Sequence, residues 1–245
     1  MNAGCFFTAG WDAPPSVKTL ITTRQGGVSE GVFASLNLGL HVCDRPQHVL
    51  HNRALVQQAV PVPMAYLNQT HSTDVVRAAD SIAQPQNADA SWDDTGKAAC
   101  TVMTADCLPV LFCHQSGNVV AAAHAGWRGL AGGILQNTVR AMGVPAHEIM
   151  AYLAPAIGAE SFEVGGDVQA AFCAPNPAAQ SCFAPQGNGK YLADIYGLAR
   201  QILQQAGVSR IYGGDFCTVK ESDRFFSYRR DGQTGRMASA VWIER

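Results

Sequence analysis

The most constraining feature of this sequence is a long apolar stretch at residues 98–126, AACTVMTADCLPVLFCHQSGNVVAAAHAG, which a turn signal interrupts near its middle. The stretch is typical of β-strands, and the dipeptide Ser116-Gly117 is typical of a two-residue β-hairpin loop. Such a loop pairs the strands so that Cys107 lies opposite Gly126. The stretch therefore predicts a buried hairpin around which the rest of the chain has to build a sheet.

The register of this hairpin brings a histidine close to a cysteine. His124 precedes Gly126 by two residues, so its side chain lies on the same face of the sheet as that of Cys107. Diagonal neighbours of this kind are about 7–8 Å apart at the backbone, and their side chains can share one ion or contact each other. We therefore expect this thiol and this imidazole to form a pair.

The rest of the chain mixes strand and helix patterns and contains no internal repeat. Helical spacing of apolar residues predicts helices within residues 45–60, 130–142, 165–174 and 192–207. Strands are expected within residues 17–24, 64–80, 148–158, 208–217 and 236–244, and a glycine-punctuated loop is expected at residues 25–42. Because the order is not a strict β–α–β alternation, the sequence predicts an α/β fold, a single layered domain over residues 1–245 with mixed sheets.

Composition excludes several functional classes. The 245 residues are 47% hydrophobic, the net charge is −2, and the arginines are spread along the chain, so no nucleic-acid partner is expected. We expect no membrane partner and a cytoplasmic protein, because neither a signal peptide nor an apolar run of transmembrane length is present. Eight cysteines without a CxxC pair favour a reducing compartment, in which most thiols serve as small buried apolar groups. The sequence indicates no particular oligomeric state.

A second histidine can complete a metal site with the Cys107–His124 pair. His71 lies in the polar stretch NQTHSTD between two apolar runs. One thiolate and two imidazoles would bind zinc through three protein ligands and leave a fourth position for water or substrate. Asp106 or Asp74 could orient the ligands from behind. The spacing alone favours another interpretation, a buried thiol beside two hydrogen-bonded histidines. The remaining histidines are interpreted as surface or helix residues: His41, His48, His51, His114 and His147.

Several blocks of the sequence resemble one protein family. These are TTRQGGVSEGVFASLNLGLHV, NQTHSTDVV, TADCLPVLF, HAGWRGLAGGI, APAIGAESFEVGGDV and FFSYRRDGQTGRMAS, in this order from about residue 17 to the C-terminus. Together they look like the YfiH-type family, long catalogued as multicopper polyphenol oxidoreductases (laccase domain) and later recognised as purine nucleoside phosphorylases. The chain departs from the usual family pattern at Ala154, where glycine is common, and at residues 69–72.

The resemblance implies a fold, a cofactor and an activity. The fold would be a layered α/β fold with mixed sheets flanked by helices, distantly similar to the cysteine-hydrolase domain of cytotoxic necrotizing factor toxins. His71, Cys107 and His124 would bind zinc. The activity would be phosphorolysis of adenosine, inosine, guanosine and methylthioadenosine, with adenosine deamination as a second reaction. Editing of peptidoglycan precursors is attributed to some bacterial relatives, which leaves a Cys-His hydrolase as the alternative.

Phosphorolysis requires a binding site for a phosphate dianion. Arg128 lies in a glycine-rich turn expected to open a helix, and its planar fork suits phosphate. Arg24 in TTRQGG and Arg229 in SYRR are further candidates, and each of the three is alternatively a solvated surface arginine. Trp127 either stacks on a purine base or packs against the core.

Copper chemistry fits the sequence less well. A multicopper oxidase needs many histidines, whereas this chain has seven and no H-x-H pair. A Cys-His-His site can take up copper in vitro, because copper outcompetes zinc for such ligands. We therefore expect at most a weak, copper-dependent oxidation of phenols, as in a laccase.

Overall fold

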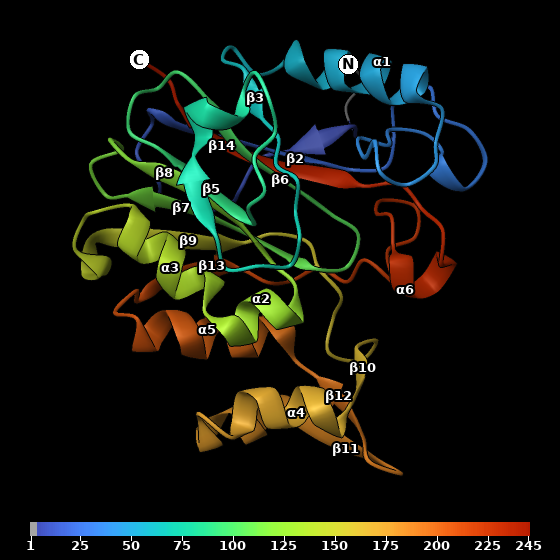
Figure 1. Ribbon diagram of the computed structural model, residues 1–245, viewed down its shortest axis with the longest axis vertical. Helices are drawn as coiled ribbons and strands as arrows, with labels where there is room; N and C mark the ends of the chain where they lie inside the picture. The colour runs from blue at the N-terminus through green and yellow to red at the C-terminus, as the bar shows by residue number, and fades with distance from the viewer. Residues whose placement is uncertain (1–3) are drawn as a thin grey trace.

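A computed structural model describes residues 4–245, and two large sheets packed face to face form its centre (Figure 1). Three pairs of the first sheet are antiparallel, and β3 pairs with β6 in parallel. In spatial order, the first sheet consists of β1 (Phe6–Phe7), β2 (Val17–Thr22), β14 (Met237–Ile243), β6 (Ala99–Thr104) and β3 (Met64–Ala65).

The second sheet contains the hairpin expected from the sequence. Its two outermost strand pairs are parallel and its three central pairs are antiparallel, so the sheet is mixed. In spatial order, it consists of β13 (Arg210–Gly213), β9 (Ile149–Leu153), β7 (Leu108–His114), β8 (Val120–Ala125), β5 (Ala90–Asp93) and β4 (Val75–Arg77).

Strand β7 is buried along its whole length because both of its faces are covered. Leu111 points into the core between the two sheets, where it joins Val102 of β6 and Val241 of β14. Val110 and Phe112 point the other way, into a core that the helices close. A strand covered on both faces is expected to be continuously apolar, which explains why the LPVLFC run does not alternate with polar residues.

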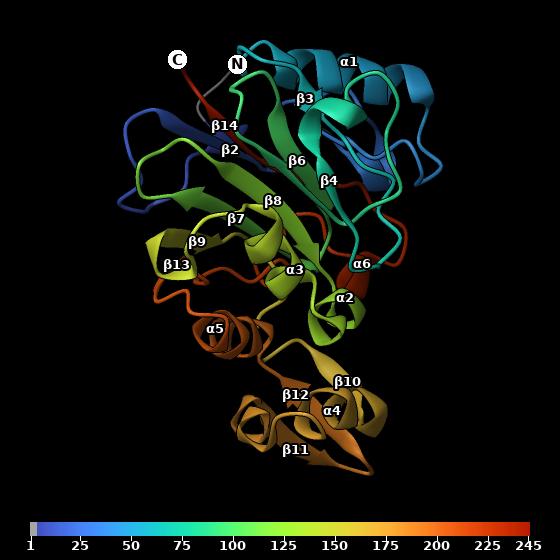
Figure 2. The ribbon, with the colours of Figure 1, turned by 60° about the vertical axis from the view of Figure 1, so that its left-hand side comes forward.

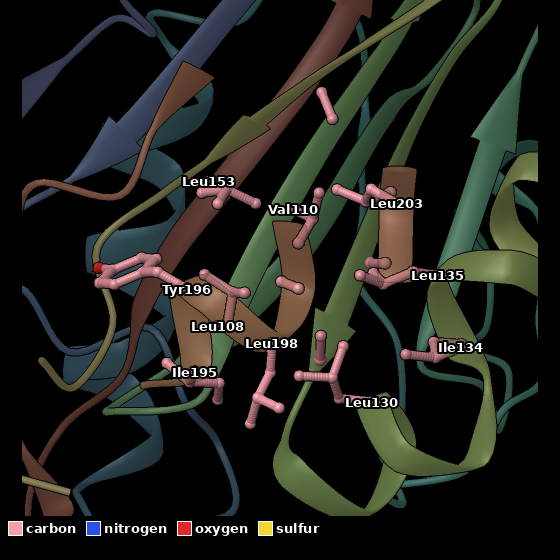
Figure 3. Packing of buried hydrophobic residues seen from close by; sticks show 14 of the residues in the cluster. Leu108, Val110, Leu130, Ile134, Leu135, Leu153, Ile195, Tyr196, Leu198 and Leu203 are labelled. Atoms are coloured by element: carbon pink, nitrogen blue, oxygen red, sulfur yellow. The ribbon is translucent and has the colours of Figure 1, made fainter. Parts of the chain in front are cut away.

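Helices cover the outer faces of both sheets and give the molecule four layers (Figures 1 and 2). Helix α1 (Pro46–Gln57) lies over the first sheet, where Val56 packs in one cluster with Leu20 of β2 and Trp242 of β14. On the second sheet lie α2 (Trp127–Gly132), α3 (Ile134–Ala141) and α5 (Ile195–Gln205), whose leucines and isoleucines pack on β7 and β9 (Figure 3).

A smaller unit projects beyond the helices of the second sheet (Figures 1 and 2). It contains β10 (Glu163–Gly165), α4 (Gly166–Cys173), the 3₁₀ helix η4 (Pro177–Cys182), β11 (Phe183–Gly187) and β12 (Lys190–Ala193), and its strands form a three-stranded antiparallel sheet. The remaining elements are the short helix α6 (Tyr228–Asp231) and the 3₁₀ turns η1 (Gly31–Phe33), η2 (Ala78–Ser81) and η3 (Ala146–Glu148).

The structure confirms the α/β class, the mixed sheets and the hairpin register, and it corrects three local expectations. Pro109 pairs with His124, as predicted, but the hairpin loop is longer than two residues, because the last backbone bond joins His114 to Val119. The helix expected at residues 130–142 begins earlier, at Trp127, and Gly133 breaks it in two with a φ of 104°. The three-stranded sheet was not expected. Within residues 4–245, every helix is too short or too polar to cross a membrane.

Candidate metal centre and substrate cavity

The candidate site lies at one end of the interface between the two large sheets. In β7 and β8, every second residue points toward the first sheet, including Leu111 and Val120. Cys107 and His124 continue these two series, one just before β7 begins and the other near the end of β8. The core is thus apolar along most of the hairpin and ends in a thiol and an imidazole.

Asp89 fixes the loop that supplies His71, the third residue of the cluster. This carboxylate is fully buried and accepts hydrogen bonds from the backbone N–H groups of Thr70, His71 and Ser72, at 3.1, 3.0 and 2.6 Å. Its Oδ1 also lies 2.7 Å from Nδ1 of His124. Asp89 therefore positions two of the three side chains of the cluster.

The three side chains converge tightly enough to hold one metal ion. One ligand atom each from His71, Cys107 and His124 lies within 4.8 Å of the others, and Cys107 Sγ is 3.9 Å from His71 Nε2. Zinc bonds of about 2.0–2.3 Å require ligand atoms roughly 3.5 Å apart, so a small inward movement suffices. Asp89 holds Nδ1 of His124 and leaves its Nε2 for the ion, the usual arrangement behind a zinc-bound histidine. The donor set therefore fits zinc.

The charges of the cluster reinforce one another. Burial raises the pKa of the Cys107 thiol, but His124 and then His71 outweigh it and bring that pKa down to about 6. Burial lowers the pKa of His124, but Cys107 and Asp89 outweigh it and raise that pKa to about 9. Burial also raises the pKa of Asp89, yet the hydrogen bonds from His124 and Ser72 lower it to about 2. The ion-free cluster thus favours a thiolate, the state that binds metals.

The position of Gly126 beside the cluster leaves no room for a side chain. A Cβ atom at this position would lie 2.9 Å from Cδ2 of His71 and 3.1 Å from Sγ of Cys107. Its φ of −62° is open to any residue, so crowding and not backbone conformation demands the glycine. The sequence of HAGWRG is therefore partly dictated by how closely two ligands approach the start of α2.

The cluster opens into a cavity of about 490 Å³ that is lined by both apolar and basic side chains. The apolar lining residues are Trp127, Ile157, Phe162 and Ile195, and the basic ones are His41, Arg128, Arg229 and Arg236. Two of the arginines lie over aromatic rings of the lining, Arg128 over Trp127 and Arg229 over Phe162. Cavities of this size, apolar with a few convergent polar groups, are typical of small-molecule sites.

The three arginines considered from the sequence lie in different surroundings. Arg128 is exposed at the cavity, with its guanidinium 4.3 Å from the ring centre of Trp127. Arg229 also lines the cavity and donates to the carbonyl of Glu163 at 2.9 Å. Arg24 lies elsewhere, where its guanidinium donates to two backbone carbonyls, those of Ala34 and Ser222, and stacks over Phe226. The structure thus brings two of the three to the cavity that the cluster also lines.

The carboxylates suggested from the sequence as orienting groups have other partners. Asp106 accepts hydrogen bonds from the hydroxyl of Thr218 and the backbone N–H of Arg229, both at 2.6 Å. Asp74 contributes its carbonyl, which accepts from the backbone N–H of Asp89. The carboxylate that orients the cluster is Asp89, and only its place just before a strand could have indicated it.

Two histidines assigned to the surface or to helices have more specific places. His41 is exposed but lines the cavity, where burial, Arg236 and Arg53 lower its pKa and favour the neutral imidazole. His114 is buried in β7, with its two ring nitrogens beside Ser116 and Glu148. Arg236 in the cavity wall was not considered from the sequence, although it lies in the FFSYRRDGQTGRMAS block.

A family model and two named relatives match almost the whole chain. A family described as multi-copper polyphenol oxidoreductase laccase matches residues 18–244. A Pseudomonas aeruginosa protein named purine nucleoside phosphorylase is 50% identical over 245 residues, which cover all of both chains. The Escherichia coli purine nucleoside phosphorylase YfiH is 49% identical over 235 residues, or 95% of this chain and 96% of the relative.

Solved structures share the same architecture. A crystal structure of a Neisseria meningitidis protein superposes with a TM-score of 0.98 at 63% identity and covers 98% of this chain and all of its own. The Bacillus licheniformis hypothetical protein YfiH superposes with a TM-score of 0.92 at 31% identity, over 99% of this chain and 98% of its own. The fold therefore persists across a twofold range of sequence identity.

Proposed function

This chain belongs to the multi-copper polyphenol oxidoreductase laccase family, and from that membership we propose that it is a zinc-binding purine nucleoside phosphorylase. The substrates we propose are adenosine, inosine, guanosine and methylthioadenosine, together with phosphate. The observation that carries the proposal is the convergence of His71, Cys107 and His124 at a cavity lined by arginines and by apolar side chains.

Phosphorolysis replaces a bond from the sugar C1′ to a purine nitrogen by a bond from C1′ to a phosphate oxygen. The sugar passes through a cation-like state, so the site must hold the phosphate dianion on one face and support the leaving purine. We assign the phosphate to the arginines of the cavity lining, with Arg128 and Arg229 as its ligands, because guanidinium forks match phosphate oxygens.

The apolar lining residues suit the purine. Phe162 and Trp127 supply aromatic side chains to the cavity lining, and Ile157 and Ile195 supply aliphatic ones. A planar base bound among these side chains would displace water, which competes with phosphate for the cation-like sugar. The apolar lining therefore favours both binding of the base and transfer to phosphate rather than to water.

The cluster is the proposed catalytic centre, with Cys107, His124 and His71 as the zinc ligands. Zinc held by these ligands would supply Lewis-acid chemistry for the attack of water on the purine carbon that bears the amine, with loss of ammonia, so adenosine deamination is the second reaction we propose. Asp89 keeps the proton of His124 on Nδ1, so that Nε2 stays directed at the centre.

The test is the phosphate dependence of product release. Protein of defined zinc content, incubated with adenosine and phosphate, should release adenine and ribose 1-phosphate. The variant His71→Ala should lose zinc and most of this activity. Adenine release at the same rate without phosphate would contradict the phosphorylase assignment, and inosine formation would report the deaminase reaction separately.

A Cys-His hydrolase that edits peptidoglycan precursors is the second candidate. It is favoured by the low pKa of the Cys107 thiol beside His124, since a thiolate next to an imidazolium is an activated nucleophile. A deletion strain that accumulates a serine-containing precursor, cured by the wild type but not by Cys107→Ala, would support it. Weak phenol oxidation after copper loading is the remaining activity we propose for the same three ligands.

A further inference from the structure

Arg236 is a half-buried cation in the cavity wall whose guanidinium is only partly used. Nη1 donates to the carbonyls of Thr234 and Gly235, each at 3.0 Å. Within residues 4–245, Nε and Nη2 have no hydrogen-bond partner, and the guanidinium forms no ion pair. These two groups form one edge of the guanidinium, the fork that binds two oxygens of one anion.

A buried asparagine holds Arg236 in place. Asn37 is fully buried, and its Oδ1 accepts hydrogen bonds from the backbone N–H groups of Arg236 and Gly39, both at 2.9 Å. A Cβ on Gly39 would lie 2.8 Å from Cγ of Arg236, so the loop packs directly on the aliphatic part of the arginine. The cation is therefore held before any ligand binds, which reduces the entropy lost on binding.

The surroundings of Arg236 leave its charge without a dedicated counter-ion. Burial lowers the pKa of Arg236, and the charges of Cys107, Asp106 and Tyr228 only partly oppose this effect. The carboxylate of Asp106 already accepts from Thr218 and from the backbone of Arg229. Half-buried charges normally have a partner, so an unsatisfied guanidinium edge at a cavity indicates a site for an anion.

The other two arginines of the cavity, Arg128 and Arg229, are held less firmly in position for binding an anion. Arg128 is exposed and its guanidinium is held mainly by the ring of Trp127. Arg229 is exposed as well and already donates to the carbonyls of Ser161 and Glu163. Both can close on a bound ligand, but neither is anchored from behind as Arg236 is.

We propose that Arg236 is the anchoring ligand of a phosphate-binding site beside the Cys107–His71–His124 cluster, and that its Nε–Nη2 edge binds two phosphate oxygens. The binding itself does not depend on the reaction, whereas the role of the phosphate as a co-substrate rests on the proposed phosphorolysis. In that reaction Arg236 would hold the dianion, while Arg128 and Arg229 complete its shell.

The test is titration of the zinc-loaded protein with inorganic phosphate by calorimetry, in four proteins of equal zinc content. Arg236→Met should weaken phosphate binding about ten- to a hundredfold, the range expected for losing a charge-assisted bidentate contact. Arg236→Lys keeps the charge but loses the fork, so a smaller loss is expected. It also serves as the test variant if the methionine variant does not fold.

The matched control is Arg200→Met. Arg200 is also half-buried, and its guanidinium also donates to two backbone carbonyls, those of Ile211 and Gly213, but it lies on α5 outside the cavity lining. This variant should bind phosphate within twofold of the wild type. Phosphate binding by Arg236→Met within twofold of the wild type would overturn the proposal, as would a wild type that binds no phosphate.

The outcome also separates this inference from the proposed function. A wild type that binds phosphate through Arg236 but releases purine independently of phosphate would retain the anion site and remove the phosphorylase assignment. If both hold, Arg236→Met should raise the KM for phosphate about tenfold or more, with a much smaller change in the KM for the nucleoside.

Discussion

The two ends of the β7–β8 hairpin each carry a histidine bound to a carboxylate, and the histidine at one end, His124, lines the cavity described above. At the loop end, Nε2 of His114 lies 2.8 Å from Glu148 and Nδ1 lies 2.7 Å from Ser116. At the other end, Nδ1 of His124 lies 2.7 Å from Asp89, and Nε2 remains for the cluster with Cys107.

The difference shows that a carboxylate partner does not by itself make a histidine functional. Both nitrogens of His114 are occupied, so its ring only ties the loop end to Glu148. His124 has one nitrogen held and one available, which is the condition for binding a metal or moving a proton. Substitutions at the two ends should therefore have effects of different kinds.

The largest effect is expected from Cys107→Ala. Removing the only thiolate of the cluster leaves two imidazoles, so zinc should be lost and phosphorolysis should fall about a thousandfold or more. The measurements are metal content and steady-state rates. The matched control is Cys113→Ala, which removes a fully buried thiol from the strand that follows Cys107, on the face that points toward the first sheet, and should lower stability but retain zinc. Full zinc occupancy in Cys107→Ala would show that the ligand assignment is wrong.

The next effect is expected from Gly126→Ala. The added methyl group would press on His71 and Cys107 and displace the ligands, and misplacement of reacting groups by about 1 Å can cost roughly a hundredfold in rate. Zinc affinity and kcat should therefore fall together. Gly10→Ala is the control, because a Cβ at that position meets no atom within 4 Å. An unchanged zinc affinity in Gly126→Ala would contradict the crowding that defines this end of the hairpin.

Asp89→Asn should weaken zinc binding about tenfold, because the amide no longer stabilises the ligand orientation as a carboxylate does. It should also change the acid stability of the ion-free protein. The pKa of Asp89 is lowered to about 2 from 3.8, so its contribution, about 2 kcal/mol, is complete above pH 4 and is lost as the pH falls toward 2.

Urea unfolding of the ion-free protein at several pH values tests this expectation. The wild type should lose more stability than Asp89→Asn between pH 4 and pH 2, since the variant lacks the titrating carboxyl. Equal losses in both proteins would show that Asp89 carries no linked stability.

The smallest effect on activity is expected from His114→Gln. The side chain loses contacts to Ser116 and Glu148, which should lower the free energy of unfolding by about 1–2 kcal/mol. Zinc content and kcat should stay within twofold of the wild type, because the loop end lies at the far end of the hairpin. A loss of zinc in this variant would remove the distinction between the two ends.

Much of the candidate site followed from one local pattern in the sequence. A hairpin with a turn at Ser116-Gly117 places Cys107 and His124 on one face, and the observed pair of Pro109 with His124 has this register. The longer loop did not change the register, because it is centred on the same dipeptide: His114 lies opposite Val119, as it also would beside a two-residue turn.

The supporting residues were much harder to predict. Asp89 carries no motif, and it reaches the cluster because β5 pairs with β8 and the 68–74 loop folds over it. Arg236 faces the cavity because β14 begins beside the end of β6, with Met237 opposite Thr104. The three-stranded sheet consists of strands of three to five residues, and such short segments carry little periodicity.

The sequence by itself determined the family, the α/β class and the pairing of a thiol with an imidazole, because each depends on local order or on a two-residue alternation. Only the tertiary structure decided that Asp89 is the carboxylate that orients the ligands and that Arg236 is the half-buried arginine of the cavity lining. Those choices depend on loops and strands distant in sequence that meet only when the two sheets pack, and no local pattern encodes that meeting.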